Sequence, residues 1–386
     1  MTSLKVSSTA EIISAVPYLI GFHPADSLTV VAVRGWRLAF AVRIDLPELG
    51  ADPEEARTAI LHLASVVASQ GIQAVTIVGY GDSERVAPAV HRLSKSFGRA
   101  GITVIDEVRV ADGRYWSYTR PECCPKEGVP CEPPDSVLAA EATFAGAVAL
   151  PSREALADQV APVIGDDREA MIAATARAEL RLAELAAEHC EAEAEAEAEA
   201  EAEAEAEAEA EVDEGEKAES HETEVDSPEP GKGESQAVGE DVGPLPNEAL
   251  FLQAVNRAGR EAVREAERRY RAGARLTDDE AAWLGLLLLH LPVRDYAWVR
   301  ANLQGYQIAL WADLVRRVEP AFIPAPASLL AFAAWRSGAG ALASIAIERA
   351  LTHEPSYSMA ILLLQALVEG LRPQKLDGWP LVESSL

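Results

Sequence analysis

An uninterrupted alternation of glutamate and alanine over residues 191–211 constrains everything that this chain of 386 residues can fold into. Both residue types favour helices and disfavour strands. On a helix, a glutamate at every second position appears on all faces, so no apolar stripe is left to bury. Residues 188–241 carry a net charge of −21, out of −28 for the whole chain. The alternation therefore contributes nothing to a core, and the chain has to fold as two parts on either side of it.

The residues that follow the alternation are rich in Glu, Gly, Ser and Pro and poor in large apolar side chains. Such a composition cannot bury enough surface to offset the entropy of ordering the chain. We therefore predict an acidic, low-complexity linker over residues 191–246. The chain is therefore expected to divide into four segments: an α/β domain over 1–150, a helical connector over 151–190, this linker, and an α-helical domain over 247–386.

The first 150 residues alternate between strand and helix patterns. Ser8 and Glu11 have the spacing of a capping box, which predicts a short opening helix. Arg34–Gly35 separates a β-branched run from a second strand pattern and indicates a hairpin, and Asp112–Gly113 indicates a second hairpin. The order after the opening helix is ββαβαββ, which predicts an α/β sandwich with a mixed sheet. The expected strands are 28–33, 36–46, 72–78, 102–110 and 115–118, and the expected helices begin at Asp52–Pro53 and at Ser83.

Almost everything after Asn247 has a helical pattern, which predicts an all-α domain. One window of this region resembles the tetratricopeptide pattern, because Gly338 fits the turn between two helices and Ala343 and Ala350 fit small positions at their contact. The expected helices are 248–270, 278–291, 295–303, 306–318, 327–335, 341–351 and 356–369.

Several classes of partner and compartment are disfavoured by the sequence. The most apolar run, residues 281–293, is interrupted by His290 and Pro292 and is too short to span a membrane. The first residues lack the pattern of a signal peptide, so we expect a cytoplasmic protein without stable disulfides. There is no run rich in Lys and Arg, so neither nucleic acid nor a membrane is an expected partner.

Two loops of the α/β domain are candidate ligand sites. Residues 79–83 form a strand-to-helix turn in which Gly79 and Gly81 would let the backbone approach a phosphate, followed by Asp82 and Ser83 at the helix start. The alternative is a tight turn with Asp82 or Ser83 as the helix cap. The second loop, residues 21–27, holds three polar side chains that could contact a ligand or simply form a turn: His23, Asp26 and Ser27.

Cys123, Cys124 and Cys131 lie together in a proline-rich loop. Zinc sites need four thiolate or imidazole ligands, usually with a spaced pair of cysteines. Here the fourth ligand would have to come from elsewhere, such as Cys190 or a distant histidine. We favour free thiols, with a zinc site or a regulatory disulfide as the alternatives, and we predict no cofactor.

Five segments spread over nearly the whole chain outside the acidic segment carry a resemblance. They are VPYLIGFHPADSL at 16–28, WSY at 116–118, CCP at 123–125, the alanine-rich stretch 341–351 and PSYSMA at 355–360. With these segments the chain resembles the actinobacterial domain-of-unknown-function family 4192, which implies a cytoplasmic setting and no established activity. In that family a further cysteine often precedes the Cys-Cys pair, whereas residues 119–122 here contain none, which argues against a metal role.

No catalytic signature emerges from the sequence, and we do not expect an enzyme. The favoured hypothesis is a non-enzymatic interaction or scaffold module whose helical C-terminal half binds a protein partner. The alternative is a small-ligand-binding or enzymatic α/β domain with its site near the 21–27 and 79–83 loops, because open α/β sheets bind ligands at strand ends. The two hypotheses differ in whether these loops converge on one cleft.

Overall fold

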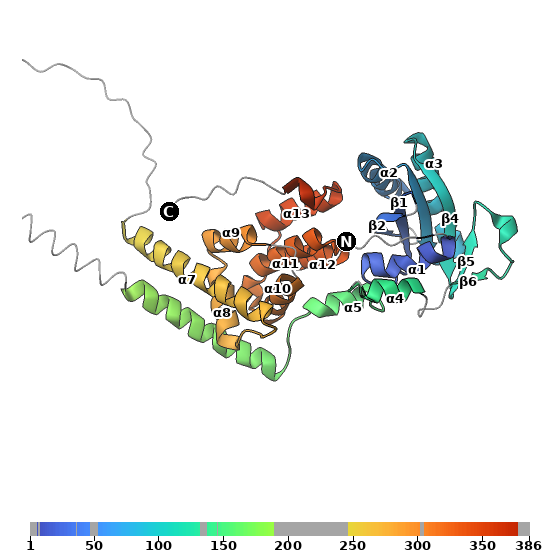
Figure 1. Ribbon diagram of the computed structural model, residues 1–386. Coiled ribbons are helices and arrows are strands. Elements are labelled where there is room, and N and C mark those ends of the chain that lie inside the picture. Colours follow the sequence, from blue (N-terminus) through green and yellow to red (C-terminus); the bar gives the residue numbers. More distant parts are fainter. Residues whose placement is uncertain are drawn as a thin grey trace, which may run out of the picture.

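The computed structural model describes residues 6, 8–35, 37–46, 53–131, 137–144, 146–188, 246–301 and 305–376. In these residues an α/β half is followed by an all-helical half, which confirms the fold class expected from the sequence (Figure 1). The predicted linker over 191–246 lies outside the described residues, except for Pro246, where helix α7 begins. None of the described helices is long and apolar enough to cross a membrane.

The α/β half is built on a mixed six-stranded sheet. Its strand order is β2-β1-β3-β4-β5-β6, and only β3 and β4 run parallel to each other. All five predicted strands are present, and the short strand β6 adds a sixth. The strands are β1 (Ser27–Arg34), β2 (Arg37–Asp45), β3 (Ala74–Tyr80), β4 (Thr103–Ala111), β5 (Arg114–Ser117) and β6 (Val129–Pro130).

Helices cover both faces of this sheet. Helix α1 (Thr9–Ile20) covers one face, where its apolar residues pack against Val31 and Val78 of the sheet. Ser8 caps α1 and accepts a hydrogen bond from the backbone N–H of Glu11, as the capping-box spacing predicted. Helices α2 (Pro53–Ser69) and α3 (Ser83–Arg99) cover the other face over Val30 and Ile77. Helix α4 (Val137–Phe144) packs beside α1.

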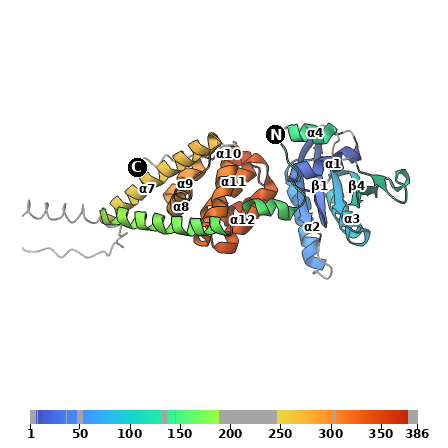
Figure 2. The same ribbon diagram turned by 90° about the horizontal axis from the view of Figure 1, so that it is seen from below.

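The connecting residues after α4 belong structurally with the helical half. Helix α5 (Arg153–Ala157), the short helix η2 (Asp158–Val160) and a helix over 166–188 bury Val160 and Met171 in the same core as the C-terminal helices. The backbone N–H of Val163 donates to the carbonyl of Arg316, 2.9 Å away. Figure 2 shows the helix over 166–188 lying along the C-terminal bundle.

The helical half contains the seven helices that the sequence predicts, with several shifted boundaries. The second predicted helix stops at Leu287, and the third begins at Leu291 instead of Asp295, because Pro292 fits the first turn of a helix and not its last. The helices are α7 (Pro246–Arg271), α8 (Asp278–Leu287), α9 (Leu291–Val299), α10 (Gly305–Arg317), α11 (Pro324–Ser337), α12 (Gly340–His353) and α13 (Ser358–Val368), with η3 (Pro320–Phe322) and η4 (Pro373–Leu376).

Helices α11 and α12 form a tightly packed pair. Gly338 ends α11 in the left-handed conformation, with φ of 88°, which glycine adopts without strain. Ala343 and Ala350 are completely buried, which fits the small side chains that close helix packing needs. The hairpin therefore has the small residues and the glycine turn where the sequence analysis expects them.

In the described part of the chain, the two halves contact each other in two regions. At the first, Phe22 from the α/β half is buried in the helical core, with the Arg43 guanidinium over its ring. At the second, the end of α13 lies against α2, where the Gln70 amide donates to the carbonyl of Gly370, 2.7 Å away. The contact between the halves therefore includes both core burial and hydrogen bonds.

The contact at α2 leads to a first prediction. A Cβ on Gly370 would lie 2.4 Å from Cγ1 of Val66, so Gly370→Ala should separate α13 from α2. Gly273→Ala is the matched control, because Gly273 has a similar positive φ and open space around it. We expect Gly370→Ala to lower the free energy of unfolding by about 1–3 kcal/mol more than the control, the usual cost of overpacking. Urea unfolding measures this difference, and equal losses in the two variants would contradict the contact.

Candidate functional site

The structure brings together the two loops that the sequence singles out. Ser27, at the start of β1, pairs with Tyr80 at the end of β3. Asp26 and Gly81 are in contact, and the Asp26 carboxylate forms an ion pair with Arg85, one turn into α3, at 2.6 Å. The loops thus converge, but the Asp26 side chain binds a neighbour of the other loop. Ligand binding by these loops stays a prediction.

Individual residues of the two loops have structural partners. A Cβ on Gly79 would lie 2.3 Å from Cγ1 of Val86, so a glycine here lets α3 pack on the sheet. Asp82 caps α3 through its backbone carbonyl and makes no side-chain cap bond, and Ser83 is the first helical residue. His23 is exposed, and its backbone N–H donates to the carbonyl of Leu150.

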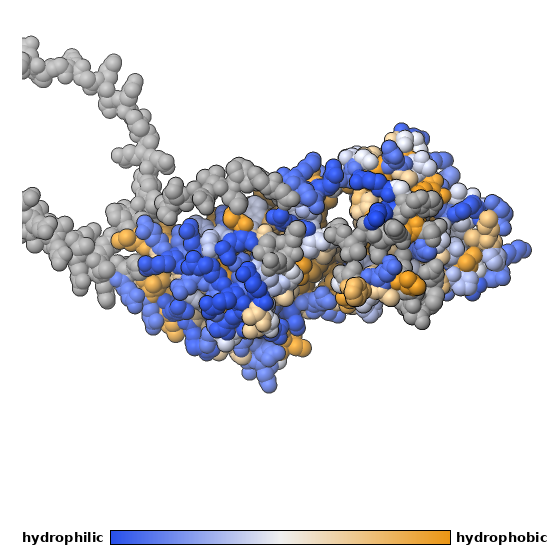
Figure 3. All heavy atoms as spheres, in the orientation of Figure 1, coloured by the Kyte–Doolittle hydropathy of each residue, from blue (hydrophilic) through white to orange (hydrophobic). Residues whose placement is uncertain are grey.

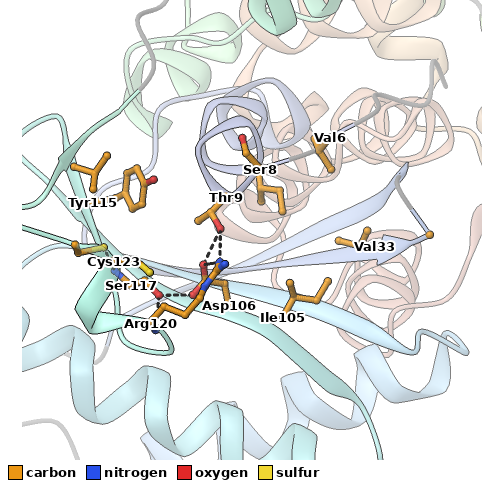
Figure 4. Close-up of a pocket in the computed structure, with 14 residues that line it drawn as sticks. Val6, Ser8, Thr9, Val33, Ile105, Asp106, Tyr115, Ser117, Arg120 and Cys123 are labelled. Atoms are coloured by element: carbon orange, nitrogen blue, oxygen red, sulfur yellow. Dashed lines mark hydrogen bonds and ion pairs between the residues drawn. The ribbon is translucent and has the colours of Figure 1, made fainter.

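A pocket of the α/β half lies at the opposite end of β1 from these loops. It has a volume of about 450 Å³ between the start of α1, the end of β1, strands β4 and β5, and the loop after β5 (Figure 4). One side is aliphatic and the other is polar. The residues that line it are Val6, Ser8, Thr9, Ile12, Val33, Gly35, Ile105, Asp106, Tyr115, Ser117, Arg120, Cys123, Cys124 and Val129.

A buried carboxylate organises the polar side of this pocket. The Asp106 side chain is only 1% exposed. Its Oδ1 accepts hydrogen bonds from the Ser117 hydroxyl at 2.6 Å and from the Glu107 backbone N–H at 3.0 Å. Its Oδ2 accepts from the Thr9 hydroxyl at 2.7 Å and from Nη2 of Arg120 at 2.8 Å. One carboxylate therefore ties together α1, β4, β5 and the loop that follows β5.

The carboxylate is held in its charged form. Burial alone would raise the pKa of Asp106, but hydrogen bonds from Ser117, Thr9 and Arg120 outweigh it and hold the pKa below its ordinary value. The pKa of Tyr115 is raised, first by burial and then by neighbouring thiol and carboxyl groups, so its hydroxyl keeps its proton. At neutral pH the pocket thus contains an ion pair between Asp106 and Arg120 and a neutral phenol.

An irregularity in β4 places Asp106 on the correct face of the sheet. Val75 pairs with Val104, but the next residue of β3, Thr76, pairs with Asp106, so Ile105 is an extra residue in the ladder. Val104 packs toward α2 and α3, whereas Asp106 and the alternate residues after it face α1. Bulges of this kind redirect a side chain and are common beside functional sites.

The three cysteines of the loop lie in two different environments. Cys123 and Cys124 line the pocket, and the Cys124 sulfur accepts a hydrogen bond from the Ser117 backbone N–H at 3.4 Å. Cys131 packs partly against the core under α1, where burial raises the pKa of its thiol. Among the described residues, no three His, Cys, Asp or Glu side chains are grouped so as to hold a metal ion. Cys190 lies outside the described residues, and the choice between free thiols and zinc stays a prediction.

The sequence analysis missed the residues that hold this site together: Asp106, Arg120, Ser117 and Thr9. The signal in the sequence is the acidic residue Asp106 inside the strand Thr103–Ala111. Helices cover both faces of this sheet, so a carboxylate in the strand is buried and needs hydrogen-bond partners. Which partners it finds depends on residues 97 and 14 positions away, Thr9 and Arg120.

Comparison with known proteins identifies a family. A family model described as a domain of unknown function (DUF4192) matches residues 10–226 and 234–374, which include all the lining residues except Val6, Ser8 and Thr9. No curated protein and no solved structure matches the chain.

The buried carboxylate leads to a prediction with a defined pH dependence. Asp106→Asn should lower the free energy of unfolding by about 1–3 kcal/mol at neutral pH, since it weakens charged hydrogen bonds. The folded pKa of Asp106 is below the unfolded one, so its contribution is present above the unfolded pKa and is lost as pH falls through the folded pKa.

The difference between wild type and Asp106→Asn should therefore shrink as the pH is lowered from about 7 to about 3. Chemical unfolding at several pH values measures it. Asp82→Asn, at an exposed carboxylate without a side-chain cap bond, is the control. A difference that stays constant over this range would show that Asp106 does not stabilise the fold through its charge.

Proposed function

The chain belongs to the DUF4192 family, a domain of unknown function, and from its geometry we propose that the α/β half binds a small molecule in the pocket of Figure 4. The observation that carries this proposal is the pocket itself, about 450 Å³ in volume, with a rigid polar side facing an aliphatic one. Ligand pockets usually have volumes of about 300–1,000 Å³ and combine an apolar lining with a few fixed polar groups.

The polar side of the pocket is suited to binding rather than to catalysis. A general base needs a free lone pair within reach of the substrate, whereas both oxygens of Asp106 already accept two hydrogen bonds each. The Ser117 hydroxyl donates to Asp106, and among the described residues it is not paired with a histidine. We therefore propose a non-enzymatic, ligand-binding protein that needs no cofactor.

This proposal moves the ligand site away from where the sequence analysis placed it. The earlier candidates, in the 21–27 and 79–83 loops, lie where β1 begins and β3 ends. The pocket lies where β1 ends and beside the early part of β4. Both are on the α/β half, so the class of function is retained and the location changes.

Thiol labelling tests the proposal, because two cysteines line the pocket and a third does not. A small molecule that occupies the pocket should slow alkylation of Cys123 and Cys124 by iodoacetamide and leave the rate at Cys131 unchanged. The full-length protein is incubated with a library of organic acids, alcohols, amides and amines, and the labelled cysteines are identified by mass spectrometry.

Selective protection of Cys123 and Cys124 by at least one compound supports the pocket as a binding site. Equal slowing at all three cysteines would indicate a general change of the protein. If no compound class protects Cys123 and Cys124, small-molecule binding at this pocket is wrong.

A second candidate function is protein binding by the helical half, in the cytoplasm of an actinobacterium, with neither nucleic acid nor a membrane as partner. The hairpin of α11 and α12 resembles a tetratricopeptide unit, and such units bind proteins when they are stacked. A groove of about 620 Å³ between α7, α8 and the helix over 166–188 favours this candidate. In it, the Arg181 guanidinium stacks 4.2 Å from the centre of the Trp283 ring.

The groove combines alternating charges with nearby apolar side chains. Arg264 and Arg268 line it together with Glu261 and Glu265, so it presents both signs of charge. Leu180, the neighbour of Arg181 in the sequence, is 64% exposed. Figure 3 shows this region as a mainly hydrophilic surface with isolated hydrophobic patches. The partner that fits is an amphipathic helix with charges of both signs.

Charge insertion beside the groove tests this second candidate. Leu180→Asp should abolish capture of a protein that the wild type captures from an actinobacterial lysate. Leu61→Asp, at a 45% exposed leucine of α2 in the other half, should leave capture unchanged. If both variants still capture the protein, or if both lose it, this groove is not the partner-binding site.

A further inference from the structure

The free hydrogen-bonding groups of the Figure 4 pocket restrict the chemistry of its ligand. Asp106 has four acceptor positions, and all four are used: two on Oδ1 by Ser117 and Glu107, and two on Oδ2 by Thr9 and Arg120. The Ser117 hydroxyl also accepts from the Arg120 backbone N–H at 3.0 Å. A ligand that brings a hydrogen-bond donor or a positive charge therefore finds the buried carboxylate already occupied.

The donors of the pocket, by contrast, are not all used. Within the described residues, the guanidinium hydrogen bonds of Arg120 leave from Nη2, to Asp106 at 2.8 Å and to Thr9 at 3.3 Å. The hydrogens on Nε and Nη1 stay available, and the Arg120 side chain is 53% exposed at the pocket. Tyr115 adds a protonated hydroxyl, and Figure 4 shows it pointing toward the inside of the pocket.

The position of Arg120 is fixed before any ligand arrives. Its guanidinium is held by the buried Asp106, and its backbone N–H is held by Ser117. A side chain that is already ordered loses less conformational entropy when it binds a ligand. Asp106 and Thr9 are thus positioning residues, and Arg120 is the group that meets the ligand.

The charge balance of the site distinguishes between anions. Asp106 and Arg120 together are neutral, so a ligand with a single negative charge leaves a net charge of −1, whereas a phosphate dianion would leave −2 beside a buried carboxylate. Charges crowded in a partly buried site repel one another strongly. A planar carboxylate is therefore favoured over a phosphate.

The aliphatic side of the pocket determines which kind of group the rest of the ligand carries. Val6, Ile12 and Val33 present aliphatic side chains. Ile105, the extra residue of the β4 bulge, is 43% exposed although it is large and apolar. A ligand with an aliphatic chain would remove this surface from water, which is favourable.

We infer that the pocket recognises a small aliphatic monocarboxylate, whose carboxylate is bound by Arg120 and whose chain lies against Ile105 and the neighbouring valines. This inference rests on the proposed function, since it names the class of ligand for the same pocket. The carboxylate accepts hydrogen bonds from Nε or Nη1 of Arg120 and from the Tyr115 hydroxyl.

Four ligands with the same hydrocarbon chain test the inference on the full-length protein. Hexanoate, hexanamide, hexylamine and hexyl phosphate are titrated by isothermal titration calorimetry. Because charge-assisted hydrogen bonds are the stronger ones, we expect hexanoate to bind about tenfold more tightly than hexanamide. Hexylamine and hexyl phosphate should bind more weakly than hexanamide.

Variants separate the role of Arg120 from general effects. Arg120→Gln should remove the preference for hexanoate over hexanamide, and Thr9→Val should weaken hexanoate binding while it keeps the preference. Arg92→Gln, on the exposed side of α3, removes the same charge away from the pocket and should change nothing. Thermal unfolding of each variant checks that it is folded. If Arg120→Gln does not fold, the preference of the wild-type protein among the four ligands still tests the inference.

The outcomes distinguish the inference from the proposed function. If hexanamide, hexylamine or hexyl phosphate binds as tightly as hexanoate, the pocket binds small molecules but not through carboxylate recognition, and the inference is wrong. If none of the four binds and no compound protects Cys123 and Cys124, the proposed function is wrong as well. An unchanged preference in a folded Arg120→Gln variant would also overturn the inference.

Discussion

The hydrogen-bonded carboxylate of Asp106 is the interaction on which the site of the α/β half depends. A carboxylate that is 1% exposed is stable only if its oxygens are fully satisfied. Its partners come from the first turn of α1, from β5 and from the loop after β5, so satisfying the charge fixes these elements relative to one another. The pocket is the space left between them, and its free donor, Arg120, is oriented by the same carboxylate.

The two halves of the chain are built around different kinds of core. The sheet half buries β-branched residues on both faces, whereas the helical half also buries ion pairs, such as that between Arg317 and Asp313, and packs alanines between α11 and α12. The connecting helices share the core of the helical half, and Phe22 enters that core from the other half. These shared contacts couple the helical core to the α/β half.

The sequence analysis predicts the elements well but does not find the pocket of Figure 4, for a physical reason. Strand and helix patterns are local, and β1, β3 and α3 appeared close to where their residue patterns placed them. The turn at Gly79–Ser83 has glycines that suit phosphate binding, and in the structure Gly79 makes room for Val86 of α3. A glycine needed for packing and a glycine needed for a ligand have the same sequence signal.

The sequence by itself determined the α/β and all-α halves, the glycine turn at Gly338, and the two small residues Ala343 and Ala350 at a helix contact. These follow from periodicity, turn chemistry and residue size over a few neighbouring positions. Only the tertiary structure decided the site, because a bulge at Ile105 turns Asp106 toward α1, and its partners Thr9, Ser117 and Arg120 come from separate parts of the chain. A one-residue change of register reverses the face of every following side chain, and no local pattern records it.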